Sequence, residues 1–302
     1  MTQLYSLLLK LEIIMKKLGL ATALVLAMTG AHAYQFEIQG QSEALDSNGD
    51  NRDFNNYTVG GQATYYLKNV DASKGPLAEA AFVNQASNVS LGYNFANLDD
   101  TKSQNVGVKA EAYVPTPYTP AYASLSYSAT DNDGKYGETD DRGQRWAVEF
   151  GSVIAPNFLV AVGYTNVVEQ TSLDTFKILN SGFAKAVGET ATIADDQDAI
   201  TARTKYVGAI DGTPMSIGFE TGLVYGEDTA YELKTDLYLN SQLSAGVSYA
   251  ESSFAGSPDS AWGVNVNYFI TPAIAVGASY LNANGVNAAD MQTVGLNAKV
   301  RF

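Results

Sequence analysis

Charged side chains recur at every second position in several segments of this 302-residue chain. Lys109 and Glu111 show the pattern, which places both side chains on the same face of an extended strand. Charges of both signs on one wall can create a transverse electric field that sorts solutes. Alternatively, they only solvate a water-filled interior and pair across strands. The side chains that share this placement are Glu37, Lys68, Lys109, Glu111, Arg145, Glu149, Arg203, Lys205, Glu220, Glu232, Lys234, Asp236, Lys299 and Arg301.

The N-terminus has the features of a secretory signal peptide that covers residues 1–33. Two lysines precede the apolar run Leu18–Met28, and the small residues Ala31 and Ala33 form a cleavage site. The run is too short to span a bilayer. Met15 is a natural start for this signal, which would make residues 1–14 an upstream extension.

The rest of the chain alternates apolar and polar residues with a period of two, the pattern of strands with one apolar and one polar face. In the first such segment, Tyr34, Phe36 and Ile38 are expected on the apolar face. Fourteen strands are predicted near residues 34–42, 56–68, 88–95, 104–114, 121–129, 143–154, 158–168, 200–210, 215–225, 230–239, 243–250, 261–269, 273–281 and 291–302.

The predicted connections alternate between short and long. Two break the alternation: 69–87 is long and carries a potential helical turn at 76–82, and 226–229 is short. Several strands end in tyrosine just before a long connection, which predicts an aromatic girdle at a membrane interface. These residues are Tyr127, Tyr164, Tyr249 and Tyr280.

Three features favour an all-β transmembrane barrel over a secreted soluble β-sandwich. A signal peptide exports the chain, the strands have the length and alternation of membrane strands, and the chain ends in Phe302 on an amphipathic last strand. In lipid the edge strands must pair with each other, so the sheet closes into an antiparallel up-and-down barrel. Fourteen strands give a backbone radius of roughly 14 Å, too wide for side chains alone to fill.

Three stretches resemble the putative porin family of gammaproteobacteria, and are most similar to its small water-channel outer-membrane members. They are the signal region through Gln39, the segment Asn69–Ala80, and the terminal Lys299–Phe302. The resemblance implies a passive channel in the outer membrane. Phe302 also resembles the signal by which the barrel assembly machinery recognises its substrates. Solute preference does not carry over, because the long middle connection is where we expect such relatives to diverge.

The chain is acidic, with a net charge of −14, and the excess of acidic residues lies in the long connections. Acidity argues against a nucleic-acid partner, and a mean hydropathy of −0.09 argues against a bundle of membrane helices. An acidic mouth would attract cations. The expected partners are outer-membrane lipid and lipopolysaccharide, water and small hydrophilic solutes, with host-protein contact through the loops as a further option.

The longest connection, 169–199, carries apolar residues that are unusual in an exposed loop. We hypothesise that it folds inward and narrows the lumen; a lid over the mouth and a protein-contact surface are the alternatives. The residues on which this hypothesis rests are Phe176, Lys177, Phe183 and Lys185.

Catalysis is not expected. The chain has no cysteine, and its one histidine, His32, lies in the signal peptide. Enzymatic barrels of the phospholipase, palmitoyltransferase and omptin types use a histidine for proton transfer. The stretches Asp46–Asp50 and Asp131–Gly134 have neither Gly at position six nor Glu at position twelve of a calcium loop. The sequence therefore predicts no cofactor, no metal site, and a pore that leans towards cations. The alternative is an interaction protein with a plugged lumen.

Overall fold

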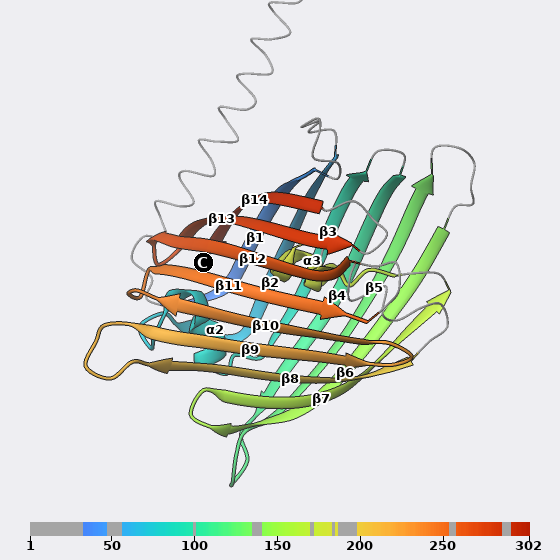
Figure 1. The fold of residues 1–302 in the computed structure, drawn as a ribbon. Coiled ribbons are helices and arrows are strands. Elements are labelled where there is room, and N and C mark those ends of the chain that lie inside the picture. Colours follow the sequence, from blue (N-terminus) through green and yellow to red (C-terminus); the bar gives the residue numbers. More distant parts are fainter. Residues whose placement is uncertain are drawn as a thin grey trace, which may run out of the picture.

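The protein folds into a single closed barrel of fourteen antiparallel strands (Figure 1). This computed structural model describes residues 33–46, 56–98, 101–134, 141–169, 172–182, 185–186, 198–253, 258–285 and 291–302. All fourteen predicted strands are confirmed, and the closed sheet contradicts the sandwich alternative. The signal peptide lies outside the described residues except for Ala33, which begins β1.

The strands are of similar length, and each pairs with its neighbours in sequence. They are β1 (Ala33–Asp46), β2 (Asn56–Asp71), β3 (Asn88–Leu98), β4 (Thr101–Val114), β5 (Ala121–Gly134), β6 (Asp141–Ala155), β7 (Phe158–Glu169), β8 (Asp198–Ala209), β9 (Ser216–Tyr225), β10 (Thr229–Tyr238), β11 (Leu243–Ser252), β12 (Pro258–Thr271), β13 (Ile274–Gly285) and β14 (Met291–Arg301).

The two ends of the chain close the barrel. β1 pairs with β14, and beyond that ladder the backbone N–H of Phe302 donates to the carbonyl of Phe36 at 2.9 Å. The rings of these two residues stack with centroids 5.4 Å apart. Among the strands that the structure describes, closure leaves none at an edge with unpaired backbone groups, as a lipid environment requires.

The outer face of the barrel is apolar. Leu67, Leu91 and Leu296 are each more than 60% exposed on it. Near the long connections, Trp146 packs against Tyr164 with ring centroids 5.3 Å apart, and other aromatic pairs follow around the wall. These rings form the aromatic belt that the recurrent tyrosines predicted. In the described part of the chain, no helix is long and apolar enough to cross a membrane.

The prediction for Tyr34 is wrong. Phe36 and Ile38 face outward as expected, but Tyr34 is only 5% exposed and faces the interior. The cause is a shift in the β1–β2 register between Tyr34 and Phe36, which reverses the direction of the side chains beyond it. Inside, Tyr34 packs edge-on against Tyr66 at 5.5 Å.

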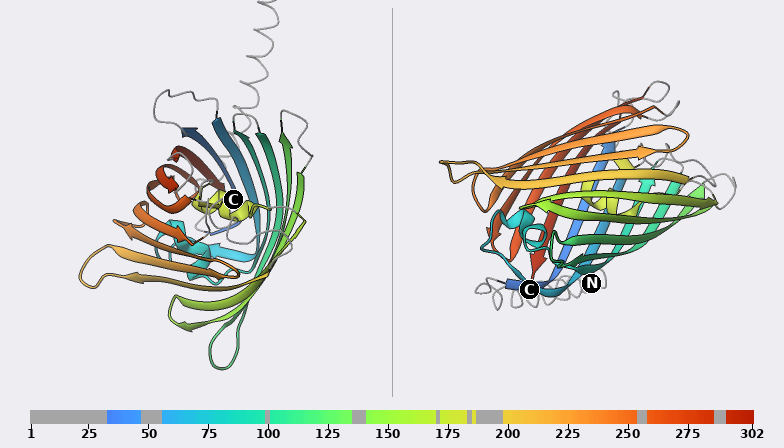
Figure 2. Two further views of the ribbon diagram at one scale, coloured as in Figure 1. Left: turned by 45° about the vertical axis from the view of Figure 1, so that its right-hand side comes forward. Right: turned by 90° about the horizontal axis from the view of Figure 1, so that it is seen from below.

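Both exceptional connections are confirmed. The β9–β10 connection is short, and the β2–β3 connection contains a short 3-10 helix η1 (Leu77–Glu79) followed by α2 (Ala80–Val83). The β7–β8 connection contains α3 (Thr175–Ser181). Figure 2 shows α2 and α3 within the ring of strands, with α2 near the end of the barrel that holds the C-terminus. We call this end the short-turn end and the opposite one the long-loop end.

Candidate functional site

Helix α3 lies inside the barrel, where the inward-folding hypothesis for 169–199 placed this segment. Asp174 caps it by accepting hydrogen bonds from the backbone N–H groups of Phe176 at 2.9 Å and Lys177 at 3.2 Å. Such a cap satisfies amide donors that the first turn leaves unpaired. Phe176 is buried, and Phe183 lies outside the described residues.

Three inward-facing glycines on β2, β3 and β4 make room for α3. A Cβ atom at Gly107 would lie 2.9 Å from the Cβ of Thr175, and one at Gly60 would lie 2.7 Å from a methyl group of Leu179. At Gly92 the nearest atom would be 3.0 Å away, again on Thr175. These separations are too short for side chains, so the helix packs directly on the backbone of the wall. We call Gly60, Gly92 and Gly107 the glycine track.

Polar groups of the same wall bind the backbone of the inward segment. The N–H of Leu173 donates to the Thr130 hydroxyl at 3.0 Å, and Gln41 donates through Nε2 to the carbonyl of Ile178 at 2.9 Å. Backbone groups buried in a lumen cost free energy unless they are paired. These hydrogen bonds therefore let the segment lie inside the barrel.

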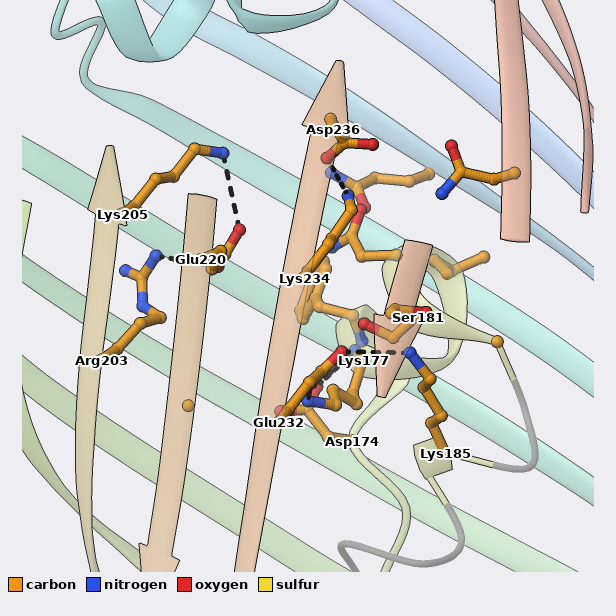
Figure 3. Close-up of a pocket in the computed structure, with 18 of the residues that line it drawn as sticks. Asp174, Lys177, Ser181, Lys185, Arg203, Lys205, Glu220, Glu232, Lys234 and Asp236 are labelled. Atoms are coloured by element: carbon orange, nitrogen blue, oxygen red, sulfur yellow. Dashed lines mark hydrogen bonds and ion pairs between the residues drawn. The ribbon is translucent and has the colours of Figure 1, made fainter. Parts of the chain in front are cut away.

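Across the lumen, the segment is held by one carboxylate of β10. Lys177 forms an ion pair with Glu232, and Lys185 lies 3.5 Å from the other oxygen of the same carboxylate (Figure 3). Burial lowers the pKa of Lys185 to about 8. Both lysines belong to the residues on which the inward-folding hypothesis rests, and both lie inside the barrel.

A second segment enters from the short-turn end. We call residues 72–87 the insert. Leu77 is buried and packs with Phe269 and Ala275 on the opposite wall. Its carbonyl accepts from Arg301 Nη1 at 2.8 Å, a bond that spans 224 residues of sequence.

Glu79 fixes the insert to strands β8 and β10, which together with β9 we call the charged wall. Its Oε2 lies 2.9 Å from Lys205 Nζ, and its Oε1 accepts a hydrogen bond from the Tyr238 hydroxyl at 2.9 Å. Lys205 also lies over the ring of Phe82, 5.1 Å from its centroid. The insert is thus held by ionic, hydrogen-bonded and cation–π contacts at once.

Between the two inward segments lies a chamber of about 640 Å³. Charged side chains are densest on β8, β9 and β10, as Figure 3 shows for Arg203, Lys205, Glu220, Lys234 and Asp236. Much of the remaining wall is uncharged, with hydroxyl and amide groups. Examples are Gln39, Gln62, Thr64, Ser90, Ser244, Ser248, Asn265, Asn267, Ser279 and Asn297.

Most residues predicted to line the interior are found there. Those that border the chamber are Lys109, Glu111, Arg145, Glu149, Arg203, Lys205, Glu220, Glu232, Lys234, Asp236 and Lys299. Glu37 and Arg301 instead form a buried pair 2.6 Å apart, on which the insert rests. Lys68 is exposed near the end of β2 and does not border the chamber.

Several of the chamber charges form ion pairs. Lys109 lies 3.1 Å from Glu111, and Lys299 lies 2.8 Å from Glu37. Arg203 has the richest set of contacts, because it lies 3.0 Å from Glu149 and donates to the Tyr122 hydroxyl at 2.8 Å. Paired charges hold water and orient polar solutes without leaving a costly isolated charge.

Several functional residues could not be recognised from the sequence pattern. Glu79 and Tyr238 fix the insert, and Tyr122 joins the carboxylates of β4 and β6 through Arg203. The glycine track left a signal in the sequence, since all three glycines occupy polar-face positions of predicted strands. Glu79 left none, because Lys205 and Tyr238 are more than a hundred residues away.

A closed antiparallel barrel with an apolar, aromatic-belted outside and a charged chamber inside defines the class of outer-membrane channels. The sequence profile described as "Putative general bacterial porin" matches residues 8–302. The chain therefore belongs to this porin family. Membership and fold together imply an outer-membrane channel.

Solved structures agree with this assignment. The chain is 49% identical to the outer membrane protein Omp33 of Acinetobacter baumannii, covering 90% of this chain and 99% of that one with a TM-score of 0.68. The monoaromatic hydrocarbon channel CymD is 9% identical, with a TM-score of 0.51 and coverage of 91% and 90%, and shares only the fold. No protein with a curated description matches the chain significantly.

Proposed function

We propose that the protein is a passive diffusion channel of the outer membrane that admits water and small hydrophilic solutes and favours cations. The observation that carries this proposal is the polar chamber of about 640 Å³ inside a closed barrel. A chamber with so many charged and amide groups is a poor place for lipid or apolar ligands, and a good one for water.

The cation preference is proposed from the long-loop end. Asp46, Asp131 and Asp133 lie at this end of their strands. Further acidic residues of the long connections, such as Asp99 and Asp196, lie outside the described residues. A negative mouth raises the local concentration of cations within about a Debye length, roughly 10 Å at 0.1 M salt.

Conductance of the purified protein in planar bilayers tests the proposal. We expect steady conductance and, across a potassium chloride gradient, a reversal potential of the sign that indicates cation preference. The double variant D131N/D133N is expected to reduce that preference without abolishing conductance. The absence of current in the wild-type protein would contradict the channel.

A second candidate function is an interaction protein with a plugged lumen and acidic loops that bind host or envelope partners. It is favoured by one observation: α3 and the insert occupy the barrel from both ends. Current that appears only after one of these segments is removed would support this candidate. The lipid, lipopolysaccharide and assembly-machinery contacts, including recognition of Phe302, are proposals that both functions share.

A further inference from the structure

Two opposite charges face the chamber from neighbouring strands. Glu220 of β9 and Lys234 of β10 are direct partners in the strand register. Both border the chamber, and Figure 3 shows them on adjacent strands of the charged wall. Side chains opposite each other on one face of an antiparallel pair have Cβ atoms about 5 Å apart.

These two side chains are the most exposed of the ion-paired charges that border the chamber, among the residues the structure describes. The Glu220 side chain is 34% exposed and that of Lys234 is 31% exposed. Asp236, the ion-pair partner of Lys234, is only 12% exposed. The Lys234 side chain is therefore more open to the chamber than the carboxylate with which it pairs.

Glu220 is held loosely by its neighbours. It lies 3.5 Å from Arg203 and 3.7 Å from Lys205. Each of these cations is closer to another carboxylate, Arg203 to Glu149 at 3.0 Å and Lys205 to Glu79 at 2.9 Å. Glu220 can thus accept a new hydrogen-bond donor without dismantling a short ion pair.

We propose that Glu220 and Lys234 form a binding site for small zwitterions that carry an ammonium and a carboxylate a few ångströms apart, as an α-amino acid does. The solute ammonium donates to the carboxylate of Glu220, and the solute carboxylate accepts from the ammonium of Lys234. The inference rests on the proposed channel function and names its favoured solute class.

The charges around the pair explain why a zwitterion fits better than a simple ion. A free anion at Lys234 meets Glu220 and Asp236, and a free cation at Glu220 meets Lys234, Arg203 and Lys205. Each simple ion therefore gains one contact and suffers repulsion from its neighbours. A zwitterion gains both contacts, and its net charge of zero avoids the repulsion.

The experiment compares L-alanine with lactamide, its neutral isomer of nearly the same size. Efflux of each labelled solute from proteoliposomes is measured at low concentration, where binding in the chamber raises the rate. Because two partly solvated ion pairs form, we expect alanine to cross about threefold to tenfold faster than lactamide. Glu220→Gln and Lys234→Gln should each bring this ratio close to one, with lactamide efflux unchanged.

Two control variants separate the site from the general charge of the lumen. Lys109→Gln removes a chamber cation from β4 and should leave the ratio unchanged. The charge swap E220K/K234E keeps the net charge of the lumen but puts like charges beside Arg203, Lys205 and Asp236, so the ratio should stay close to one. Unchanged lactamide efflux in each variant verifies an intact channel.

A wild-type ratio near one would overturn the zwitterion site while leaving the channel function intact. A ratio that survives both single variants would overturn it as well. If neither solute crosses, the channel function itself is wrong, and the site fails with it.

Discussion

Two segments enter the barrel from opposite ends, and they are held by different interactions. Helix α3 packs on the glycine track, so that Thr175 and Leu179 lie against bare backbone. The insert spans the short-turn end and is fixed by Glu79, which binds both Lys205 and Tyr238. The contact of α3 with the glycine track is van der Waals packing, whereas the contacts of Glu79 with Lys205 and Tyr238 are electrostatic.

The difference bears on what each segment can do. Close packing on backbone does not depend on salt and is lost only when the helix leaves as a unit. Ion pairs in a watery lumen are weakened by salt and can exchange partners, and Lys205 has a second carboxylate, Glu220, within 3.7 Å. We infer that α3 is the permanent narrowing of the lumen and that the insert is the more readily displaced of the two.

The largest effect is expected from removing the permanent narrowing. Replacing residues 172–186 with a short Gly-Ser linker should raise single-channel conductance several-fold, because α3 and its flanks occupy part of the lumen cross-section. The same linker in place of residues 254–257 serves as the control and should leave conductance near the wild-type value. Unchanged conductance after removal of 172–186 would mean that this segment does not restrict flow.

A bulky residue in the glycine track should loosen α3 without removing it. Gly107→Leu forces a side chain into space that Thr175 and Phe176 fill, and such overpacking costs about 1–3 kcal/mol. We expect faster trypsin cleavage after Lys177, at low and high salt alike. Gly61→Leu is the matched control, because a Cβ at Gly61 has its nearest contact at 3.4 Å. Equal cleavage of the two variants would argue against the track.

The insert should respond to the loss of one charge. Glu79→Gln removes the ion pair with Lys205, and losing a charged hydrogen-bond partner costs about 1–3 kcal/mol. In single-channel recordings we expect more frequent channel openings than in the wild type at low salt, and little difference from the wild type at high salt. Lys74→Gln removes an exposed charge of the insert and should behave as the wild type. A salt-independent effect of Glu79→Gln would remove the proposed contrast with α3.

The fold could be predicted because alternation is a local signal. One strand is recognisable from five residues, because apolar side chains alternate with polar or small ones at Trp262, Val264 and Val266. The alternation is strict because one face of the strand meets lipid and the other meets water. Tyr34 escaped because a single register shift reverses a side chain without changing composition. The helical turn in the insert was visible in sequence, whereas its position across the end of the barrel was not.

The site was predicted in part for the same reason. A polar-face position shows that Glu220 and Lys234 point inward, but strand register and barrel closure decide which inward charges meet. Glu37 and Arg301 had the same local pattern as the chamber residues, yet the insert covers them. The contacts of a segment that crosses the lumen depend on three-dimensional distances, which the alternation of residues along the chain does not indicate.

The smallest effect is expected at Glu232 of β10, whose carboxylate contacts both Lys177 and Lys185. Lys185 faces Glu232, with Lys177 and Lys234 nearby, and burial lowers its pKa to about 8. Between pH 7 and pH 9 it should therefore lose its proton, which removes a positive charge beside Glu232 and makes the lumen more negative. The reversal potential in a potassium chloride gradient should shift by a few millivolts towards stronger cation preference. Lys185→Met should show the stronger preference already at pH 7 and a smaller change with pH. If the reversal potential of this variant shifts with pH as much as that of the wild type, another group titrates, and the Lys185–Glu232 ion pair does not set the selectivity.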